Sequence, residues 1–214
     1  MLNIKAFPFN PFAMNTHVLW DETHEGVIID AGNYTNEENI ILLDFIKANS
    51  IKIMSLWFTH NHIDHIIGAK FLCEEYSVIA KSHTKGKFLF EQAEDHASML
   101  GFHFKGLPNK IVNIDDNEIL KFGNTEAKAF YTPGHVDGSM SFYFHKAKFV
   151  IVGDVLFRAG IGRTDLPTGD YHSLEKSIRE KLYTLPNSTI VFPGHGPQTS
   201  IGFEKEYNPY FQEL

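Results

Sequence analysis

The sequence has little of what stabilises small secreted proteins or places a chain in a membrane. It contains a single cysteine, Cys73, among 214 residues, so it can form no internal disulfide, and we expect a reducing compartment. Cys73 falls in an amphipathic segment, where we predict a buried structural thiol and not a nucleophile. No run approaches about 18 consecutive apolar residues, and the first residues show no signal-peptide pattern. We therefore expect a cytoplasmic protein with no membrane partner.

Positive charge is also scarce. Nineteen Lys and Arg residues against 26 Asp and Glu give a formal net charge of −7, which argues against nucleic acid or an anionic membrane as the main partner. The 19 phenylalanines indicate a core that buries large side chains. Because 214 residues suffice for one large core but hardly for two, we predict one domain over residues 1–214.

Short apolar runs alternate with helical patterns, which predicts an α/β protein. A capping box at Thr35 and Glu38 begins a helix that reaches about residue 49. The apolar run 51–58 predicts a buried strand, and 66–76 predicts the helix after it. Other strands are predicted over 2–9, 16–20, 27–29, 77–80, 111–114, 118–122, 126–131, 140–144, 148–152 and 189–192, and other helices over 84–100 and 173–182. We expect the strands 111–114, 118–122 and 126–131 to be antiparallel to one another.

The strongest chemical signal lies between the strand 51–58 and the helix that follows. The segment is Thr59-His60-Asn61-His62-Ile63-Asp64-His65, and so many polar groups cannot be packed as core without losing their partners. Imidazole nitrogen and carboxylate oxygen suit zinc, iron or manganese. His60 and His62 leave the same face of an extended chain and can bind one ion, whereas Asp64 and His65 suit a second. The alternative is a solvated loop that contains histidines by chance, which is rare directly after a strand.

Three further polar residues also follow predicted strands. His135 comes after the strand 126–131, Asp154 follows Gly153, and His195 comes after the strand 189–192. A carboxylate just beyond an apolar run and beside a glycine favours a ligand or catalytic acid over a surface charge. If these strand ends share one edge of the core, the three side chains can converge on the first cluster. The remaining histidines that we considered are expected to be structural or at the surface, namely His17, His83, His96 and His103.

This pattern resembles the metallo-β-lactamase superfamily. The order His60-x-His62-x-Asp64-His65, His135, Asp154 and His195, together with the turn Asp30-Ala31-Gly32, matches it over nearly the whole chain. The resemblance implies an α/β fold, an αββα sandwich of two mixed β-sheets flanked by helices, with a metal site in loops at one edge. It also implies two divalent metal ions, with zinc expected first and iron or manganese as alternatives.

The resemblance also implies a role for each of these residues. His60, His62 and His135 would hold one ion, Asp64, His65 and His195 the other, and Asp154 would bridge the two. Asp64 and Asp154 are the carboxylates that we expect to be catalytic. Two ions roughly 3.5–4 Å apart can hold a hydroxide at neutral pH and stabilise an oxyanion.

Within the superfamily, four short stretches resemble the short bacterial glyoxalase II-type hydrolases. They are Thr132-Pro133-Gly134-His135, Gly153-Asp154-Val155-Leu156-Phe157, Gly162-Arg163-Thr164-Asp165 and Pro193-Gly194-His195-Gly196-Pro197. The implied reaction is hydrolysis of a small-molecule thioester such as S-lactoylglutathione, by attack of the bridging hydroxide on the carbonyl. Larger glyoxalase II enzymes bind glutathione partly through an added C-terminal helical domain. Because only 19 residues follow His195, we expect no such domain, and the thiol carrier stays open.

Other functions remain as alternatives. The stretch Gly162-Arg163-Thr164-Asp165 also resembles the persulfide dioxygenase branch, which uses one iron on two histidines and an aspartate; here these would be His60, His135 and Asp154. Hydrolases of lactones, other esters, β-lactams or phosphodiesters share the fold, and the negative charge argues against nucleic-acid substrates. A metal-binding protein without catalysis would be expected to have a closed ligand set. The oligomeric state is left open.

Overall fold

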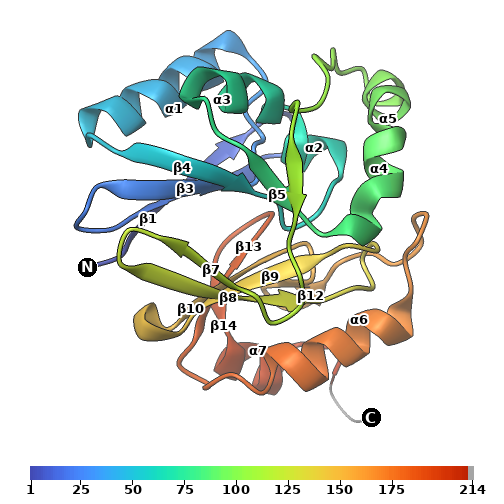
Figure 1. Cartoon of the computed structure of the whole chain (residues 1–214). Coiled ribbons are helices and arrows are strands. Elements are labelled where there is room, and N and C mark those ends of the chain that lie inside the picture. The colour runs from blue at the N-terminus through green and yellow to red at the C-terminus, as the bar shows by residue number, and fades with distance from the viewer. Residues whose placement is uncertain (212–214) are drawn as a thin grey trace.

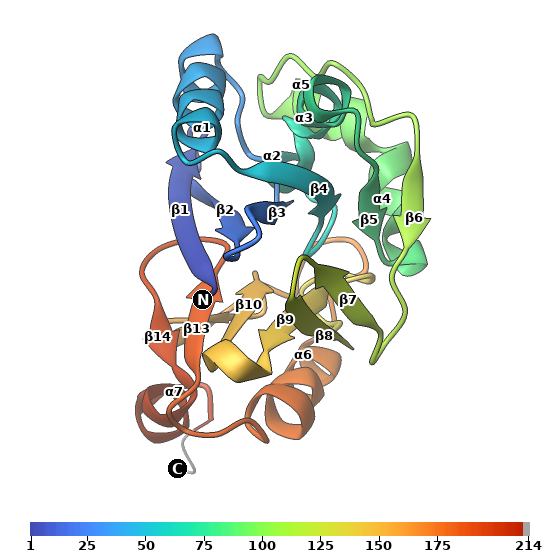
Figure 2. The ribbon, with the colours of Figure 1, turned by 60° about the vertical axis from the view of Figure 1, so that its left-hand side comes forward.

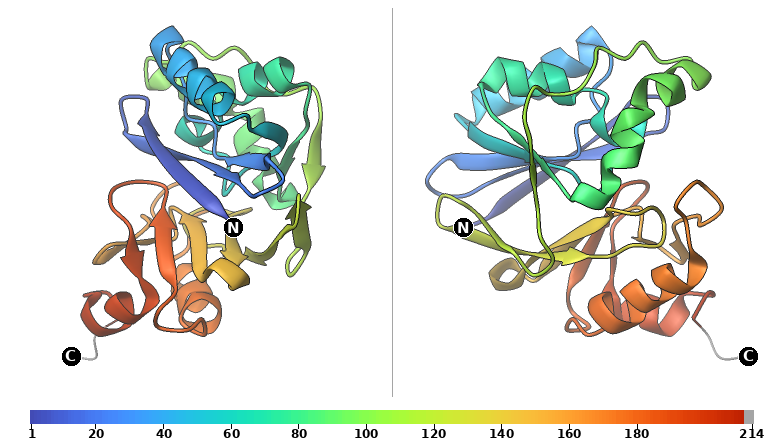
Figure 3. Two further views of the ribbon diagram at one scale, coloured as in Figure 1. Left: turned by 90° about the vertical axis from the view of Figure 1, so that its left-hand side faces the viewer. Right: turned by 45° about the vertical axis from the view of Figure 1, so that its right-hand side comes forward.

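Two six-stranded sheets form the centre of the computed structural model, which describes residues 1–211. The first half of the chain builds one sheet and the second half builds the other, so the two halves lie as separate layers (Figures 1 and 3). The first sheet has the order β1 (Asn3–Phe9), β2 (Met14–Trp20), β3 (Glu25–Ile29), β4 (Lys52–Trp57), β5 (Ala80–Ser82) and β6 (Ile111–Asn113). The second has the order β14 (Thr199–Ser200), β13 (Ile190–Pro193), β10 (Phe149–Gly153), β9 (Met140–Phe144), β8 (Thr125–Tyr131) and β7 (Ile119–Phe122).

Both sheets are mixed. Strands β1 to β3 are antiparallel and β3 to β6 are parallel. In the second sheet only the pair of β10 and β13 is parallel among the described pairs. A short ribbon of β11 (Leu156–Phe157) and β12 (Gly160–Ile161) follows β10.

Helices cover the outer face of each sheet (Figures 1 and 2). The first sheet carries α1 (Asn36–Ala48), α2 (Ile63–Ile66), α3 (Ala69–Tyr76), the 3₁₀ turn η1 (Thr84–Gly86), α4 (Lys87–Glu91) and α5 (Ala93–Met99). The second carries α6 (Tyr171–Ser177), the π-helical turn η3 (Ile178–Leu182) and α7 (Ile201–Tyr207), with the 3₁₀ turn η2 (His145–Ala147) between β9 and β10. The predicted αββα sandwich is therefore confirmed.

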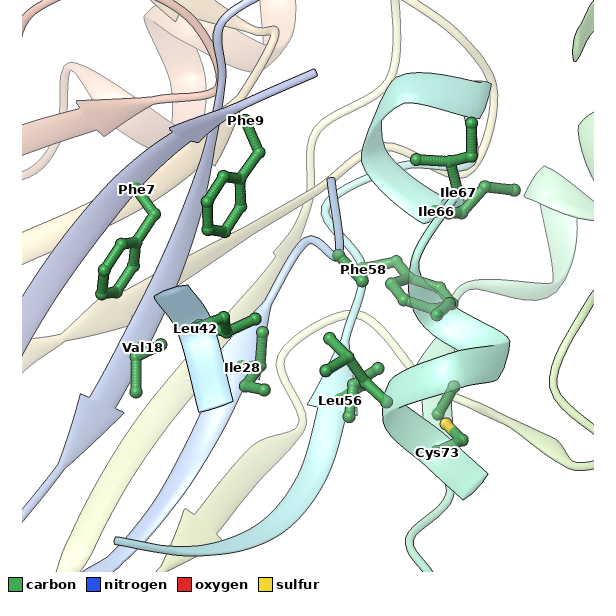
Figure 4. Close-up of a cluster of buried hydrophobic side chains, with 14 of the residues drawn as sticks. Phe7, Phe9, Val18, Ile28, Leu42, Leu56, Phe58, Ile66, Ile67 and Cys73 are labelled. Carbon is green, nitrogen blue, oxygen red and sulfur yellow. The ribbon is translucent and has the colours of Figure 1, made fainter. Parts of the chain in front are cut away.

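Three apolar layers hold the sandwich together. Between the first sheet and its helices, Ile28, Leu56 and Phe58 pack against Leu42 of α1 and the region of α2 and α3 (Figure 4). Cys73 is buried in this layer, which confirms the predicted structural thiol. The other two layers lie between the sheets, around Trp57 and Phe142, and beneath α6 and α7, around Leu174 and Ile178.

Local signals explain where several elements begin and end. The Thr35 hydroxyl accepts from the Glu38 N–H and the Glu38 carboxylate accepts from the Thr35 N–H, so the predicted capping box is confirmed. The predicted helix 66–76 is in fact divided into α2 and α3 at Gly68. A Cβ on Gly68 would lie 2.2 Å from Asn33 Oδ1, so only glycine allows this close approach.

One prediction about strand pairing was wrong. Strand β6 does not continue antiparallel into β7, but pairs parallel with β5 at the edge of the first sheet. The chain then crosses to the second sheet between Asn113 and Ile119. Within residues 1–211, none of the helices combines the length and the apolar character that a membrane span requires.

Candidate metal centre

Four loops bring the predicted site residues to one edge of the sandwich. The loop after β4 carries His60 and His62, and the short helix α2 that follows carries Asp64 and His65. Segments after three other strands carry His135, Asp154 and His195. Backbone hydrogen bonds tie these loops together across the sheets, since the Met140 N–H donates to Thr59 O at 2.7 Å. Within the second sheet, the Gly194 N–H donates to Gly153 O at 2.8 Å. All seven residues thus lie together, although they come from both sheets.

The first group consists of His60, His62 and His135. The His62 Nδ1 atom is 3.0 Å from His60 Nε2 and 3.0 Å from His135 Nε2. The three ring nitrogens lie within 4.8 Å of one another, which is the spacing of atoms that share one ion. His60 and His135 are almost fully buried.

The second group consists of Asp64, His65 and His195, with Asp154 between the groups. His195 Nε2 is 3.2 Å from Asp64 Oδ2 and 3.5 Å from Asp154 Oδ2. The other carboxylate oxygen, Asp154 Oδ1, is 3.5 Å from His65 Nε2, and Asp154 Oδ2 is 3.8 Å from His135 Nε2. Asp154 therefore faces histidines of both groups, as a bridging ligand would.

Hydrogen bonds outside the cluster orient four of the five rings. The Nδ1–H group of His60 donates to Thr59 Oγ1 at 3.2 Å, and the Nδ1–H group of His65 donates to Asp30 Oδ2 at 2.9 Å. The Nδ1–H group of His135 donates to Arg163 O at 2.8 Å, and that of His195 donates to Phe12 O at 3.0 Å. Each of these rings then turns Nε2 toward the centre. Outer partners of this kind are typical of metal-binding histidines.

The inner atoms lack the protons that would satisfy them without a cation. With Nδ1–H donated outward, neutral His60 and His135 present bare Nε2 lone pairs to His62 Nδ1, which carries one proton at most. At least one of the two 3.0 Å contacts would then join two lone pairs. Two further buried atoms, His65 Nε2 and Asp154 Oδ1, have no hydrogen-bond partner among the described residues. A divalent cation in each group fits this donor set.

The three histidines of the first group are neutral at physiological pH. Burial lowers the pKa of His60 well below 6.5, and the neighbouring imidazoles lower it further. Burial, together with nearby His135, lowers the pKa of His62 to about 3. The pKa of His135 is also lowered, chiefly by burial. Neutral imidazole is the form that binds a metal.

The second group has the opposite electrostatics because it contains carboxylates. Burial alone would lower the pKa of His65, but Asp64, Asp30 and Asp154 raise it well above 6.5. His195 behaves likewise: burial is the largest single effect and lowers its pKa, but the hydrogen bond to Asp64 and the charges of Asp154 and Asp64 together raise it above 6.5. Burial would raise the pKa of Asp64 and of Asp154, but the nearby histidines hold both below the usual range. In the protein without metal, these shifts therefore favour protonated His65 and His195 beside ionised Asp64 and Asp154.

Two features of the site were not predicted from the sequence. Asp30, which we had noted only as part of a turn, is buried and accepts hydrogen bonds from His65 Nδ1 and from the Thr59 N–H and hydroxyl. The sequence feature that could have identified Asp30 is its position directly after an apolar strand and before Ala31-Gly32. His96, expected at the surface, is half-buried and lines the pocket beside the metal centre. His17 is buried against Phe192, as expected for a structural histidine.

A pocket of about 490 Å³ lies beside the two groups. Its floor includes His62, Asp64, His135, Asp154 and His195. The walls come from α4, α5, the segment around Phe12 and the loop that precedes α6. A small molecule in this pocket would therefore touch both candidate metal positions.

The family model described as the metallo-beta-lactamase superfamily matches residues 10–195. The chain belongs to this superfamily. Its members bind divalent metals, and the clustered histidines and aspartates of this chain agree with a metal-dependent enzyme of the superfamily. The seven-residue cluster lies within the matched region, while the role of each residue as a ligand stays a prediction.

Relatives and solved structures match this chain over almost its whole length. The hydroxyacylglutathione hydrolase GloC of Haemophilus influenzae is 37% identical over 212 residues, which cover 98% of each chain. The crystal structure of the BLEG-1 B3 metallo-beta-lactamase matches with a TM-score of 0.88 and 33% identity, covering 99% of this chain and 100% of that one. The structure of TTHA1623 in a di-iron-bound form matches with a TM-score of 0.87 and 29% identity, over 96% and 99% of the chains.

Proposed function

We propose that the protein hydrolyses small-molecule thioesters such as S-lactoylglutathione, with two divalent ions at the seven-residue cluster. The observation that carries the proposal is that two ligand groups share Asp154 at the floor of an open pocket. The similarity to the GloC hydrolase over nearly the full chain supports the thioester. The di-iron form of TTHA1623 supports two ions and leaves zinc, iron and manganese as candidates.

The residues of the chain prepare the pocket for this reaction. His60, His62 and His135 would hold one ion through neutral nitrogens, and Asp64, His65 and His195 the other. When bound, the two ions would supply a water of lowered pKa and polarise the carbonyl of the substrate. Asp64 and Asp154, ionised because histidines lower their pKa values, would accept hydrogen bonds from that water and orient it. No side-chain nucleophile is needed.

The first experiment measures metal content and hydrolytic activity on the same protein samples. The purified protein is loaded with zinc, iron or manganese in turn, its metal content is measured, and S-lactoylglutathione hydrolysis is followed with and without a chelator. We expect about two ions per chain and chelator-sensitive turnover. Asp154→Asn should lower kcat by more than about 100-fold, because it removes the charge shared by both groups.

A matched control is Asp44→Asn, on the exposed face of α1 away from the cluster, which should keep the turnover. Turnover that survives the chelator, or that is equal in the Asp154 and Asp44 variants, would refute the metal-dependent hydrolase.

The mono-iron persulfide dioxygenase stays as a second candidate. The ligands that this candidate would need, His60, His135 and Asp154, belong to the same cluster, with His135 Nε2 3.8 Å from Asp154 Oδ2. Oxygen uptake with glutathione persulfide by protein that contains one iron, combined with no thioester turnover, would favour this candidate. The second group around Asp64, His65 and His195 is the observation that favours the binuclear site.

A further inference from the structure

The walls of the pocket are apolar, in contrast to its charged floor. Leu89 on α4 and Met99 and Leu100 at the end of α5 form one wall. Leu166 and Pro167, in the loop before α6, form another. In Figure 1 the green helices α4 and α5 stand above this orange loop, and the right-hand view in Figure 3 shows the same arrangement.

Several of these side chains are exposed at the pocket, where water contact is unfavourable. The exposed fraction is 83% for Met99, 52% for Leu100 and 45% for Phe12. Phe12 is held in place by an edge contact with Phe102, at 5.7 Å between ring centroids. Ala97, by contrast, lies on the side of α5 that packs into the core. Exposed apolar groups that gather at a concave site typically mark a ligand surface.

The described lining of this pocket offers no unpaired lysine or arginine that could bind a substrate carboxylate. Arg163 is the one lysine or arginine among the described lining residues. Its Nε and Nη2 atoms donate to the two carboxylate oxygens of Asp165, each at 2.7 Å. Apart from Arg163 and the proposed ligands, His96 is the one polar side chain of the described lining. Glutathione carries two carboxylates, so nothing in this lining favours that carrier over an uncharged one.

We propose that the acyl group of the thioester lies against Leu89, Met99 and Leu100, and that the enzyme prefers apolar acyl chains over the polar lactoyl group. The thiol carrier would then lie toward the open mouth of the pocket and contribute little to recognition. This inference rests on the proposed thioester hydrolase and specifies its substrate class.

The test is a series of S-acylglutathiones with acetyl, butyryl, hexanoyl and lactoyl groups, hydrolysed by the metal-loaded protein. We expect kcat/KM to rise about threefold for each added methylene, close to the fourfold that full burial would give. The double variant Met99→Ser with Leu100→Ser should flatten this dependence, since it replaces the exposed wall at little cost to the fold. The control Ile40→Ser changes an exposed apolar residue of α1 outside the pocket and should keep the dependence.

The carrier is tested by moving the same acyl groups to N-acetylcysteamine, which has no carboxylate. We expect kcat/KM within about threefold of the glutathione thioesters, whereas a preference for glutathione above about tenfold would overturn the assignment of the carrier. A rate that does not rise with acyl length, or a rise that survives in the double variant, would overturn the acyl wall.

A binding experiment separates this inference from the proposed function. S-methyl-, S-butyl- and S-hexylglutathione are thioethers that cannot be hydrolysed, and their Kd values for the metal-loaded protein can be measured by calorimetry. Affinity that increases with chain length, without turnover of any thioester, would support the wall and refute the hydrolase. Turnover combined with equal Kd values would refute the wall alone.

Discussion

Asp30 contacts the candidate metal centre from outside the proposed ligand set. Its backbone lies in the left-handed region, at φ 59°, which aspartate and asparagine tolerate better than most residues. From there one carboxylate accepts three hydrogen bonds, from the Thr59 N–H at 2.7 Å, the Thr59 hydroxyl at 2.6 Å and His65 Nδ1 at 2.9 Å. The contact with His65 orients the ring whose Nε2 faces Asp154. Replacing Asp30 therefore tests how far this outer contact determines metal affinity.

Asp30→Asn keeps the size and the backbone preference but removes the charge beside His65. We expect metal affinity at the second group to fall by about 10–100-fold, the usual effect of losing an outer hydrogen-bond partner of a ligating histidine. Competition against a chromophoric chelator measures this affinity, with Asp44→Asn as the control. Unchanged affinity for both ions would show that Asp30 stabilises only the loop at Thr59 and does not affect metal binding.

Glu204 is a second buried carboxylate, and it acts on the fold. It accepts hydrogen bonds from the Ala159 N–H, from Thr199 Oγ1 at 2.5 Å and from Asn208 Nδ2 at 2.8 Å, which ties α7 to the turn between β11 and β12. Glu204→Gln would present an amide NH₂ to these donors and leave buried groups unsatisfied. We expect the free energy of unfolding to fall by about 1–3 kcal/mol. Urea denaturation measures it, with exposed Glu94→Gln as the control, and an equal midpoint in both variants would contradict the prediction.

At the scale of elements, the parallel pair β10 and β13 brings Asp154 and His195 together. A Cβ on Gly194, just after β13, would lie 2.2 Å from Asp154 Oδ1 and 2.7 Å from His65 Cε1. Gly194→Ala should therefore displace the bridging carboxylate, with loss of metal binding and of turnover. The far-ultraviolet circular dichroism spectrum should stay unchanged.

The matched control is Gly160→Ala in the β11–β12 ribbon. There the nearest atom to the added Cβ, Phe157 Cβ, lies at an ordinary 3.8 Å. Metal content and turnover are measured for both variants. Equal metal content in the two would contradict the proposed crowding at Asp154.

The same scale shows what the sequence could predict. The capping box at Thr35 and the cluster after β4 depend on neighbouring residues, so local patterns predicted them. Strand β6 has three residues, and its partner β5 is selected by packing across the sheet, which local alternation does not encode. The position of His96 was predicted wrongly for a similar reason. His96 became a pocket residue only because α5 folds back over the cluster.

At the scale of the whole molecule, the candidate metal centre takes residues from both sheets. His60, His62, Asp64 and His65 follow a strand of the first sheet, whereas His135, Asp154 and His195 follow strands of the second. Ions bound to both sets would cross-link the layers of the sandwich. Because the unfolded chain does not keep this arrangement, the binding free energy adds to the stability of the folded state.

This cross-link predicts that bound metal raises Tm, and that the gain grows with pH. In the metal-free protein the carboxylates around His65 outweigh burial and raise its pKa well above 6.5. Its proton therefore stabilises the fold fully below about pH 6.5, and this stabilisation is lost as the pH rises through the raised pKa. A metal ion must displace that proton, so competition weakens as the pH rises.

We expect saturating zinc to raise Tm by several degrees at pH 6 and by more at pH 8, since about 1 kcal/mol shifts Tm by roughly 2–4 °C in a protein of this size. Thermal unfolding followed by fluorescence, with chelator-treated protein as the reference at each pH, measures the gain. Asp154→Asn, which removes the contact between the two groups, should reduce the gain at both pH values. A gain that is equal at pH 6 and pH 8, or that is unaffected in this variant, would mean that the ions bind outside the cluster and do not link the sheets.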